Sequence, residues 1–288
     1  MLTELFLAGR YLKPKRNAVS LITLSSVLGV TLGVENLSFS YKDRTVLDDI
    51  SFTVHSGSMT AVLGPNGVGK STLFKCILGL LTDYRGKVTI SGTETKNLAA
   101  EKLAALAAYI PQSHDTAFNF SVFDMVLMGT TARLRGFRVP SDEQSEITCQ
   151  ALERLNISFL KDRDYRKISG GERQLVLIAR ALAQKADVLI MDEPTANLDY
   201  GNSLRVLEQM RSLADQGYTI LFSTHSPDQV FLYADRVLAL SNQKILADGT
   251  PKGTISAGLI KTLYGVDVVV ESLYNDKIRC CIPQNGIL

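Results

Sequence analysis

The sequence predicts an α/β protein whose sheet is mostly parallel and is covered by helices on both faces. Three observations support this fold class: an apolar run ends in a glycine-rich turn at residues 59–72, a second run at 187–194 ends in two adjacent acids, and a third at 218–225 ends in a histidine. Helical periodicity precedes each of the last two runs. Helices that alternate with apolar strands are typical of a parallel sheet that is buried on both faces.

The first elements follow the order strand, glycine loop and helix. Apolar residues predict a strand at 32–41, and the apolar run before the glycine-rich turn predicts another strand. After the turn, Leu73, Ile77 and Leu81 recur at the i, i+4, i+8 spacing of an amphipathic helix. The α/β pattern therefore starts at about residue 32.

The middle of the chain has a different pattern. From residue 113 to about residue 167 strand-like runs disappear, and apolar residues between 147 and 155 recur at helical spacing. This pattern predicts a mostly helical insert. Helices at about 171–184 and at 203–213 then lead into the two later apolar runs.

Two strand pairs are predicted near the C-terminus. Residues 236–241 and 244–249 pair as a hairpin, and apolar residues alternate again on both sides of residues 274–276. We interpret this tail as a small β cap. The predicted organisation is an extension at 1–33, a main domain at 34–252 and a tail at 253–288.

Charge and cysteine content exclude several classes of protein. The 31 Lys and Arg residues nearly balance the 29 Asp and Glu residues, and a net charge of +2 is too small for the electrostatic footprint of a nucleic-acid-binding protein. The four cysteines lie in no C-x-x-C pattern and have no histidine at metal-ligand spacing, so a zinc site or a disulfide framework is not expected. We expect a reducing compartment and no nucleic-acid partner.

A phosphate-binding loop is predicted between the strand and the helix. Residues 64–71, GPNGVGKS, fit the pattern G-x-x-x-x-G-K-[ST] in this context. Backbone N–H groups of such a loop enclose the β and γ phosphates, Lys70 adds a positive charge, and Ser71 offers its hydroxyl to Mg²⁺. ATP and Mg²⁺ are therefore the expected ligands. The predicted nucleotide contacts in this segment are Gly64, Pro65, Asn66, Gly67, Val68, Gly69, Lys70, Ser71 and Thr72.

Two adjacent carboxylates follow the second apolar run. Asp192 and Glu193 lie at the carboxyl end of the predicted strand, where ligands bind in open parallel sheets. Carboxylates at the end of a buried strand lower stability unless they are paired or bind a ligand. In nucleoside triphosphatases with such a loop, an acid at this position holds Mg²⁺, usually through water, and the following glutamate can polarise the attacking water. We assign these roles to Asp192 and Glu193.

The phosphate-binding loop and the acids after the second apolar run do not identify one family, because kinases, GTPases and motor proteins share them. Residues 168–182, ISGGERQLVLIARAL, are more specific. Ser169, Gly170, Gly171 and Glu172 resemble the signature motif of ATP-binding cassette (ABC) ATPases, with Glu172 in place of the frequent glutamine. A serine and glycine N–H groups at a helix start form an anion site. The resemblance implies a P-loop NTPase core of the RecA-like kind, with a mostly parallel sheet, an antiparallel β portion and a helical insert.

The signature also implies an assembly. In this family the signature of one subunit closes over the γ-phosphate that the P-loop of the other subunit binds, and the motif faces away from its own P-loop. The resemblance therefore implies a homodimer that encloses two ATP molecules, and one chain alone is expected to be nearly inactive.

Four further positions match the family residue by residue. Tyr41 matches the aromatic that stacks on adenine, and Gln112 matches the glutamine that touches Mg²⁺ and links the sheet to the insert. Asp199 matches the loop that crosses the dimer interface, and His225 matches the switch histidine that contacts the γ-phosphate. The catalytic residues implied in this way are Lys70, Gln112, Glu193 and His225, and the metal ligands are Ser71, Gln112 and Asp192.

Less universal segments indicate a subgroup. Residues 103–112 and 118–129, together with the segment from 234 to 270, resemble cassettes that drive importers of iron siderophores, haem, cobalamin and molybdate. The acidic loop of exporters is missing before the signature, where residues 161–167 read KDRDYRK. We expect an ATPase at the cytoplasmic face of the membrane, which powers import of a metal chelate through a separate permease served by a substrate-binding protein. The alternatives are an export-type system that releases lipoproteins and a soluble ABC ATPase without a transport role.

Residues 1–33 do not fit the cassette pattern. They resemble the start of a lipoprotein-releasing-type permease, in which a basic segment such as RYLKPKR precedes the first transmembrane helix. Here only residues 18–30 remain for a helix, which would be about 20 Å long against an apolar bilayer core of about 30 Å. A membrane-surface helix, a remnant of a gene fusion and a signal peptide are the interpretations that stay open.

Overall fold

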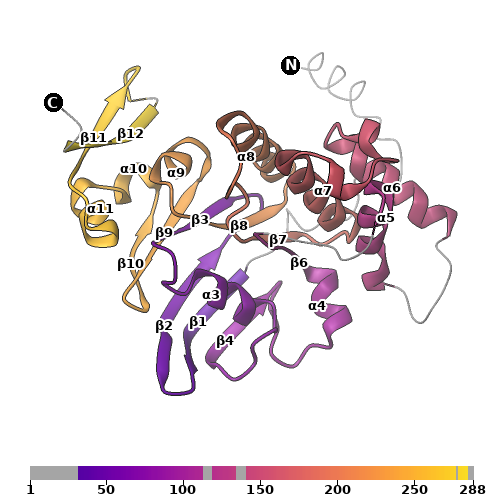
Figure 1. The fold of residues 1–288 in the computed structure, drawn as a ribbon. Coiled ribbons are helices and arrows are strands. Elements are labelled where there is room, and N and C mark those ends of the chain that lie inside the picture. The colour runs from indigo at the N-terminus through magenta and orange to yellow at the C-terminus, as the bar shows by residue number, and fades with distance from the viewer. Residues whose placement is uncertain (1–31, 113–118, 134–140, 277, 285–288) are drawn as a thin grey trace, which may run out of the picture.

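Two sheets, a C-terminal hairpin and the helices around them make up the fold (Figure 1). The computed structural model of the chain describes residues 32–112, 119–133, 141–276 and 278–284. Within these residues the predicted fold class is confirmed: parallel and antiparallel sheets are combined with helices between and around them.

The larger sheet provides the strand ends at which the candidate site lies. Its six strands, in chain order, are β3 (Met59–Leu63), β6 (Ala107–Ile110), β7 (Val188–Met191), β8 (Thr219–Thr224), β9 (Arg236–Ser241) and β10 (Lys244–Gly249). They lie in the order β10–β9–β3–β8–β7–β6, and all neighbours pair in parallel except β10, which is antiparallel to β9. The carboxyl ends of the parallel strands therefore meet at one edge of the sheet.

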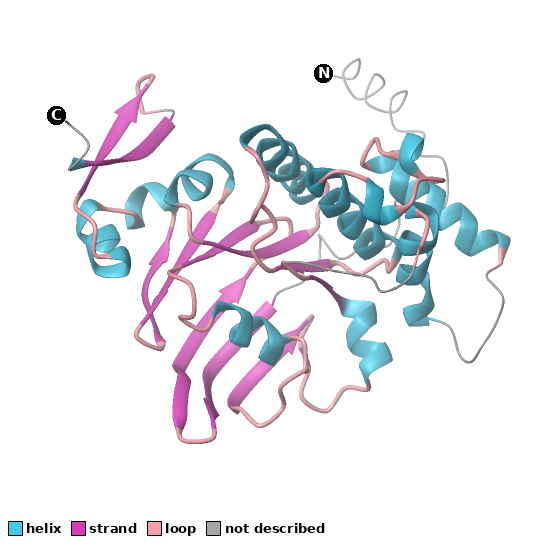
Figure 2. Cartoon of the chain, viewed as in Figure 1, coloured by secondary structure: helices cyan, strands magenta, loops and turns pink. Residues whose placement is uncertain are grey.

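Helices cover both faces of this sheet (Figure 2) because strand side chains alternate between two apolar cores. In β7, for example, Leu189 packs into one core and Val188 into the other. The first core contains apolar side chains of α7 (Gly170–Ala183) and α8 (Tyr200–Asp215), and the second those of α3 (Lys70–Ile77). Burial on both faces is the physical reason for the uninterrupted apolar runs in the sequence.

The smaller sheet is antiparallel and packs on the other side of α3. Its strands, in chain order, are β1 (Leu32–Tyr41), β2 (Arg44–Val54), β4 (Arg85–Ile90) and β5 (Thr93–Glu94). Apolar residues of β1, β2 and β4 share the second core with α3. Of these strands only β1 was predicted individually, and it begins at Leu32, so the last two residues assigned to the N-terminal extension belong to the sheet.

The helix after the glycine loop is shorter than predicted. The sequence placed Leu81 on the same helical stripe as Leu73 and Ile77, but α3 ends at Ile77. Gly79 takes a positive φ of 62°, a left-handed conformation that ends helices. Leu81 still packs against the second core, although from the connecting loop rather than from the helix.

The described part of the region between residues 113 and 167 is mostly helical. The elements there are α5 (Val122–Leu127), α6 (Asp142–Arg154) and the 3-10 helices η1 (Met128–Arg133), η2 (Ser158–Leu160) and η3 (Tyr165–Lys167). Both α5 and α6 pack against α7, which begins at the predicted signature. Another helix, α4 (Ala100–Leu106), leads into β6, and neither element was predicted.

Both hairpins predicted near the C-terminus are present. The turn between β9 and β10 consists of Asn242 and Gln243, with φ of 46° and 69°, as in the two-residue turns that match the twist of a hairpin. The second hairpin pairs β11 (Val268–Leu273) with β12 (Ile278–Pro283). The tail is more than a β cap, because the helices α10 (Pro251–Thr254) and α11 (Ala257–Tyr264) precede this hairpin.

In the part of the chain that the structure describes, no helix has both the length and the apolar character needed to cross a bilayer. The basic and apolar segment of the N-terminal extension lies outside the described residues.

Candidate functional site

Glycines give the loop between β3 and α3 a backbone conformation that other residues rarely adopt. Gly67 and Gly69 have φ of 78° and 115°, where residues with a side chain are strained. A Cβ on Gly67 would meet no atom within 4 Å, so this side of the loop is open to a ligand. A Cβ on Gly64 would lie 2.5 Å from the carbonyl oxygen of Leu240, so the loop also needs a glycine where it packs against β9.

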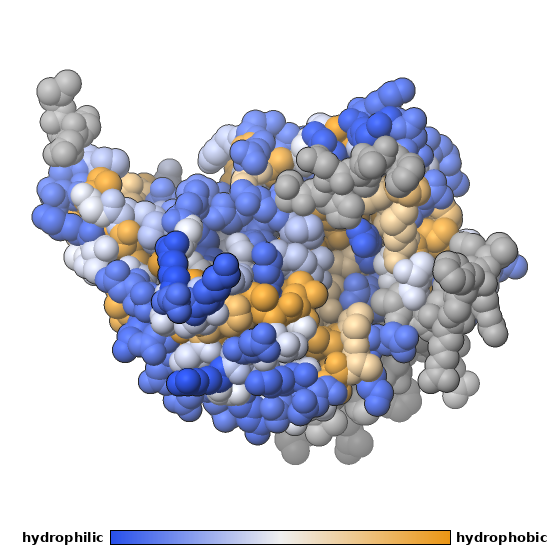
Figure 3. Space-filling view, turned by 60° about the horizontal axis from the view of Figure 1, so that its bottom comes forward, coloured by the Kyte–Doolittle hydropathy of each residue, from blue (hydrophilic) through white to orange (hydrophobic). Residues whose placement is uncertain are grey.

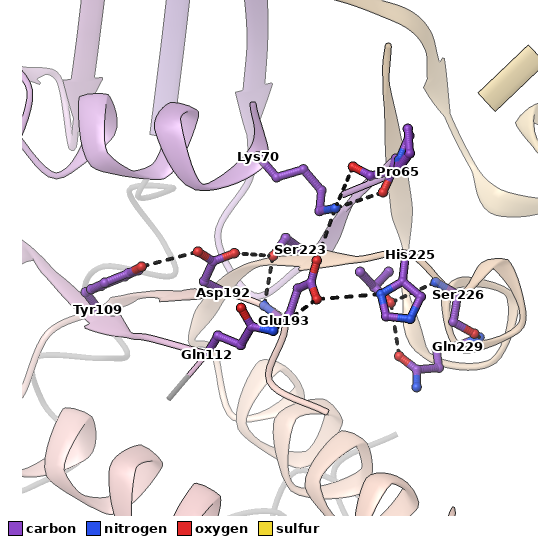
Figure 4. A network of polar contacts seen from close by, with 12 residues as sticks. Pro65, Lys70, Tyr109, Gln112, Asp192, Glu193, Ser223, His225, Ser226 and Gln229 are labelled. Carbon is purple, nitrogen blue, oxygen red and sulfur yellow. Dashed lines mark hydrogen bonds and ion pairs between the residues drawn. The ribbon is translucent and has the colours of Figure 1, made fainter. Parts of the chain in front are cut away.

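Lys70 reaches back over the loop that precedes it (Figure 4). Its Nζ donates to the carbonyl oxygens of Gly64 at 2.8 Å and Pro65 at 3.1 Å, and it lies 3.1 Å from Oε1 of Glu193. The side chain of Lys70 is only 4% exposed and that of Glu193 is 11% exposed. Since a buried charge is costly without a partner, the two groups hold each other between the loop and the end of β7.

Asp192 and Glu193 follow β7, as predicted. The backbone N–H of Asp192 donates to the carbonyl of Ile110 at 2.8 Å, which continues the pairing of the sheet by one residue. Glu193 then takes a positive φ of 45°, an uncommon conformation for a residue with a side chain. Its N–H donates to Oγ of Ser223 at 2.8 Å. This hydrogen bond holds the backbone turn that directs Glu193 toward the loop.

The Asp192 carboxylate is held by two hydroxyl groups that no sequence motif indicated. Ser223 donates to Oδ1 at 2.7 Å, and Tyr109 donates to Oδ2 at 3.3 Å. Burial and the charge of Asp192 raise the pKa of the Tyr109 hydroxyl, which therefore stays protonated as a donor. The contact of Ser223 with Asp192 follows from strand register. Met191 pairs with Phe222, which places Asp192 and Ser223, the next residues of the two strands, side by side.

The predicted catalytic residues converge on the Glu193 carboxylate (Figure 4). Lys70 contacts Oε1, as described above. Gln112 donates from Nε2 to Oε2 at 3.5 Å, and Nδ1 of His225 lies 3.6 Å from the same oxygen. The His225 side chain is 56% exposed and lies at the open end of the cluster. The structure thus brings together four residues from four separate segments of the chain.

A cavity of about 510 Å³ opens over the glycine loop, a volume within the range of small-molecule sites. The predicted nucleotide contacts that line it are Tyr41, Asn66, Gly67, Gly69, Lys70, Ser71 and Thr72, whereas Gly64, Pro65 and Val68 do not. The predicted catalytic residues Gln112 and Glu193 also line it. Arg44 and Val46 line it as well and were not predicted. Arg44 reaches the cavity because it pairs with Tyr41 in the β1–β2 hairpin. Tyr41 is 46% exposed, so its ring is open to stacking.

The signature motif does not line this cavity. Ser169 caps the N-terminus of α7: its Oγ accepts from the Glu172 N–H at 3.3 Å, and the Glu172 carboxylate accepts from the Ser169 N–H and hydroxyl, each at 2.8 Å. These bonds lower the pKa of Glu172. Glutamate in place of the frequent glutamine therefore completes a capping box.

Asp199 lies beside the signature rather than in the cavity. Its carboxylate caps α8 and accepts from Asn202 at the backbone N–H, 2.8 Å, and at Nδ2, 2.7 Å, which lowers the pKa of Asp199. A Cβ on Gly171 would lie 2.6 Å from the Asn202 side chain, so the starts of α7 and α8 are in close contact. The predicted site residues therefore form two groups, one around the cavity and one at these helix starts.

The residues around the cavity fit a magnesium ion that is held jointly with phosphate. Ser71 and Gln112 line the cavity, whereas Asp192 does not, and its carboxylate is held at the end of β7 by Tyr109 and Ser223. These are oxygen donors, as Mg²⁺ prefers, and Mg²⁺ usually takes one or two carboxylates plus substrate phosphates. The described residues contain no cluster of three or more His, Cys, Asp or Glu side chains able to hold a metal ion by themselves.

A strand, glycine loop and helix whose lysine contacts an acid at the end of another parallel strand of the same sheet define a P-loop nucleoside triphosphatase. The chain belongs to the ABC transporter family, whose model matches residues 47–196. It is an ATP-binding protein and an ATPase of this family.

Relatives and a solved structure agree with this assignment. The chain is 39% identical over 233 residues to an uncharacterised ABC transporter ATP-binding protein of Haemophilus influenzae, covering 81% of this chain and 89% of the relative. It is 35% identical over 249 residues to a Helicobacter pylori protein named "probable iron chelatin transport ATP-binding protein", covering 86% and 97%. A solved metal-chelate type ABC transporter, in an inward-facing conformation, matches with a TM-score of 0.80 and 31% identity over 90% of this chain and 99% of that chain.

Replacing Lys70 tests the assignment of the phosphate-binding loop. We expect Lys70→Ala to weaken ATP binding by about tenfold or more, because a charge-assisted contact with phosphate is lost. Titration calorimetry with ATP measures the affinity. Lys75→Ala is the matched control, since Lys75 lies exposed on the same helix. An unchanged affinity in Lys70→Ala would contradict the loop assignment.

Replacing Ser223 tests how the two acids are held. We expect Ser223→Ala to lower the free energy of unfolding by about 2 kcal/mol, because the part-buried N–H of Glu193 loses its acceptor and the buried Asp192 carboxylate loses a donor, and to slow ATP hydrolysis. Thr219→Val on the same strand is the control: Oγ1 of Thr219 is buried without a hydrogen-bond partner, so its removal should leave stability unchanged or increase it. Urea unfolding and steady-state ATPase assays measure both effects. Equal stability of the two variants would show that the Ser223 bonds contribute nothing.

Proposed function

We propose that this chain is the ATP-hydrolysing subunit of an importer that takes up a metal chelate through a separate permease. The observation that carries the proposal is the similarity, over most of the chain, to the metal-chelate type transporter and to the iron chelatin protein named above. In this proposal the chain works at the cytoplasmic face of the membrane, and a substrate-binding protein delivers the chelate to the permease. Iron siderophores, haem, cobalamin and molybdate are the solutes that the sequence pattern favours.

The geometry suggests how the residues perform hydrolysis. Loop N–H groups and Lys70 bind the β and γ phosphates, and Tyr41 stacks on the adenine. When Lys70 turns to phosphate it releases Glu193, whose carboxylate can then orient the attacking water, while His225 contacts the γ-phosphate. Mg²⁺, bound through Ser71, Gln112 and Asp192, would supply positive charge that offsets the phosphate charge.

We further propose that two copies of the chain form the complete site. The cavity around Lys70 contains none of the residues of the signature, Ser169, Gly170, Gly171 and Glu172, and Asp199 lies with the signature. An anion-binding helix start that does not face its own nucleotide can serve the nucleotide of a second copy. This arrangement accounts for a site that is divided into two groups of residues.

A second cavity is a candidate docking site for the permease. It has a volume of about 490 Å³ and lies between the end of α3, α4, β6 and α7, next to Gln112 in the chain. Its lining includes Leu80, Leu98, Leu103 and Leu177. A band of hydrophobic residues bordered by hydrophilic ones is visible on the face shown in Figure 3. Apolar hollows with polar rims bind partner side chains, and a helix of the permease is the partner that we propose here.

Replacing Glu193 tests the proposed dimer. We expect Glu193→Gln to bind ATP, to hydrolyse it at least about a hundredfold more slowly because the base is lost, and to accumulate as an ATP-bound dimer. Size-exclusion chromatography with light scattering in the presence of Mg-ATP measures the dimer, and Glu101→Gln, exposed on α4, is the control. Full hydrolysis by Glu193→Gln would overturn the role of Glu193, and a monomer with bound ATP would overturn the dimer.

Identifying the permease tests the transport class. We expect Glu193→Gln, purified with ATP from solubilised membranes, to retain a many-helix permease of the siderophore and cobalamin class that mass spectrometry identifies. Leu80→Asp should release this permease, since Leu80 is 63% exposed in the proposed docking cavity, whereas Leu246→Asp, at a site 43% exposed on β10, should not. A four-helix permease of the lipoprotein-releasing class would instead contradict import and turn the function to export.

A further inference from the structure

One side chain outside the sequence motifs joins the two loops that carry Glu193 and His225. Oε1 of Gln229, in α9 (Pro227–Tyr233), accepts a hydrogen bond from Oγ1 of Thr195 at 3.1 Å and another from Oγ1 of Thr224, also at 3.1 Å. Thr195 follows Glu193 by two residues, and Thr224 directly precedes His225. Figure 4 shows Gln229 below His225, on the side away from Lys70.

Thr224 extends this connection to the phosphate-binding loop. The residue is 4% exposed, and its hydroxyl also accepts from the N–H of Ser226 at 3.1 Å. Its carbonyl oxygen accepts from the N–H of Gly64, the first residue of the loop, at 3.3 Å. The bond to Gly64 uses the Thr224 backbone, whereas Gln229 holds the Thr224 side chain, so the end of β8 is fixed to the loop independently of Gln229.

The helix that carries Gln229 is fixed from other sides. Ser226 caps its N-terminus by accepting from the Gln229 N–H at 3.4 Å, and Val230 is fully buried in the first core. Asp228 accepts from the backbone N–H of Cys281 at 2.9 Å, where β12 of the C-terminal hairpin packs against α9. Because α9 is held in this way, it presents the Gln229 amide from a stable position.

We propose that Gln229 is a positioning residue for ATP hydrolysis. Its single amide oxygen sets the spacing between the loop after Glu193 and the end of β8, and so keeps the Glu193 carboxylate within the observed 3.6 Å of His225. Gln229 does not line the nucleotide cavity, so it acts on the rate of hydrolysis and not on ATP binding. The proposal rests on the roles proposed above for Glu193 and His225.

Substitution of Gln229 in the full chain separates positioning from packing. We expect Gln229→Met, which keeps the length of the side chain but has no oxygen acceptor, to lower kcat by about tenfold with KM for ATP unchanged. Gln229→Glu retains an acceptor for both threonine hydroxyls and should keep kcat within about twofold of the parent chain. The matched control is Gln150→Met on α6, where the exposed Gln150 amide donates to Glu146. Steady-state ATPase kinetics and Tm are measured for every variant.

A double-variant cycle tests the bridge itself. Because Gln229→Met and Thr195→Val break the same bridge, their effects on kcat should be less than additive. The proposal would be overturned if Gln229→Met had the kcat of the parent chain. It would also be overturned if Gln229→Met and Gln229→Glu lost kcat equally and both had a lower Tm. Failure of the proposed function is distinguishable, since it would appear as full hydrolysis by Glu193→Gln, whatever Gln229→Met does.

Discussion

The ion pair between Lys70 and Glu193 is the interaction on which the rest of the site depends. Both side chains are almost fully removed from solvent, and their charged atoms are 3.1 Å apart. Loss of either partner would leave an uncompensated charge in a buried position, which is far more costly than loss of an exposed ion pair. The pair also joins two segments that lie more than a hundred residues apart, so the shape of the loop depends on the end of β7.

The parallel sheet makes this ion pair possible. Its strands end at one edge, and their register places Asp192, after β7, beside Ser223 of β8. The Tyr109 hydroxyl reaches Asp192 from β6, where Tyr109 pairs with Ile190. Each hydroxyl satisfies one oxygen of Asp192, and Ser223 also accepts from Glu193. A hydrogen-bonded carboxylate is restricted in its rotation, so the acids are oriented before any ligand arrives. The strained φ of Glu193 is maintained by the same network.

The separation of the signature from the cavity follows from local packing. Ser169 and Glu172 satisfy each other at the start of α7, and Gly171 leaves room for Asn202 at the start of α8. The starts of α7 and α8 are in close contact and form one unit. The directions of these helices, and not the loop around Lys70, determine where their anion-binding N–H groups point. A divided site of this kind is the physical basis for proposing that two copies act together.

The sequence by itself determined the class of fold and most of the chemistry. The spacing of the glycine loop, the acids after an apolar run and the SGGE segment are local patterns, and local patterns can be read directly from residue order. The β9–β10 and β11–β12 hairpins were predictable for the same reason. The end of α3 was not, because the apolar spacing of Leu73, Ile77 and Leu81 continues past the left-handed turn at Gly79.

Only the tertiary structure decided which other residues support the site. Tyr109, Ser223 and Gln229 belong to no motif, and Arg44 enters the cavity through its pairing with Tyr41. Their roles depend on strand register and on the position of α9, which arise from contacts between residues distant in sequence. A single sequence records periodicity along the chain but not which strand lies beside which. Hydrogen bonds between neighbouring strands and helices therefore appear only when the whole fold is assembled.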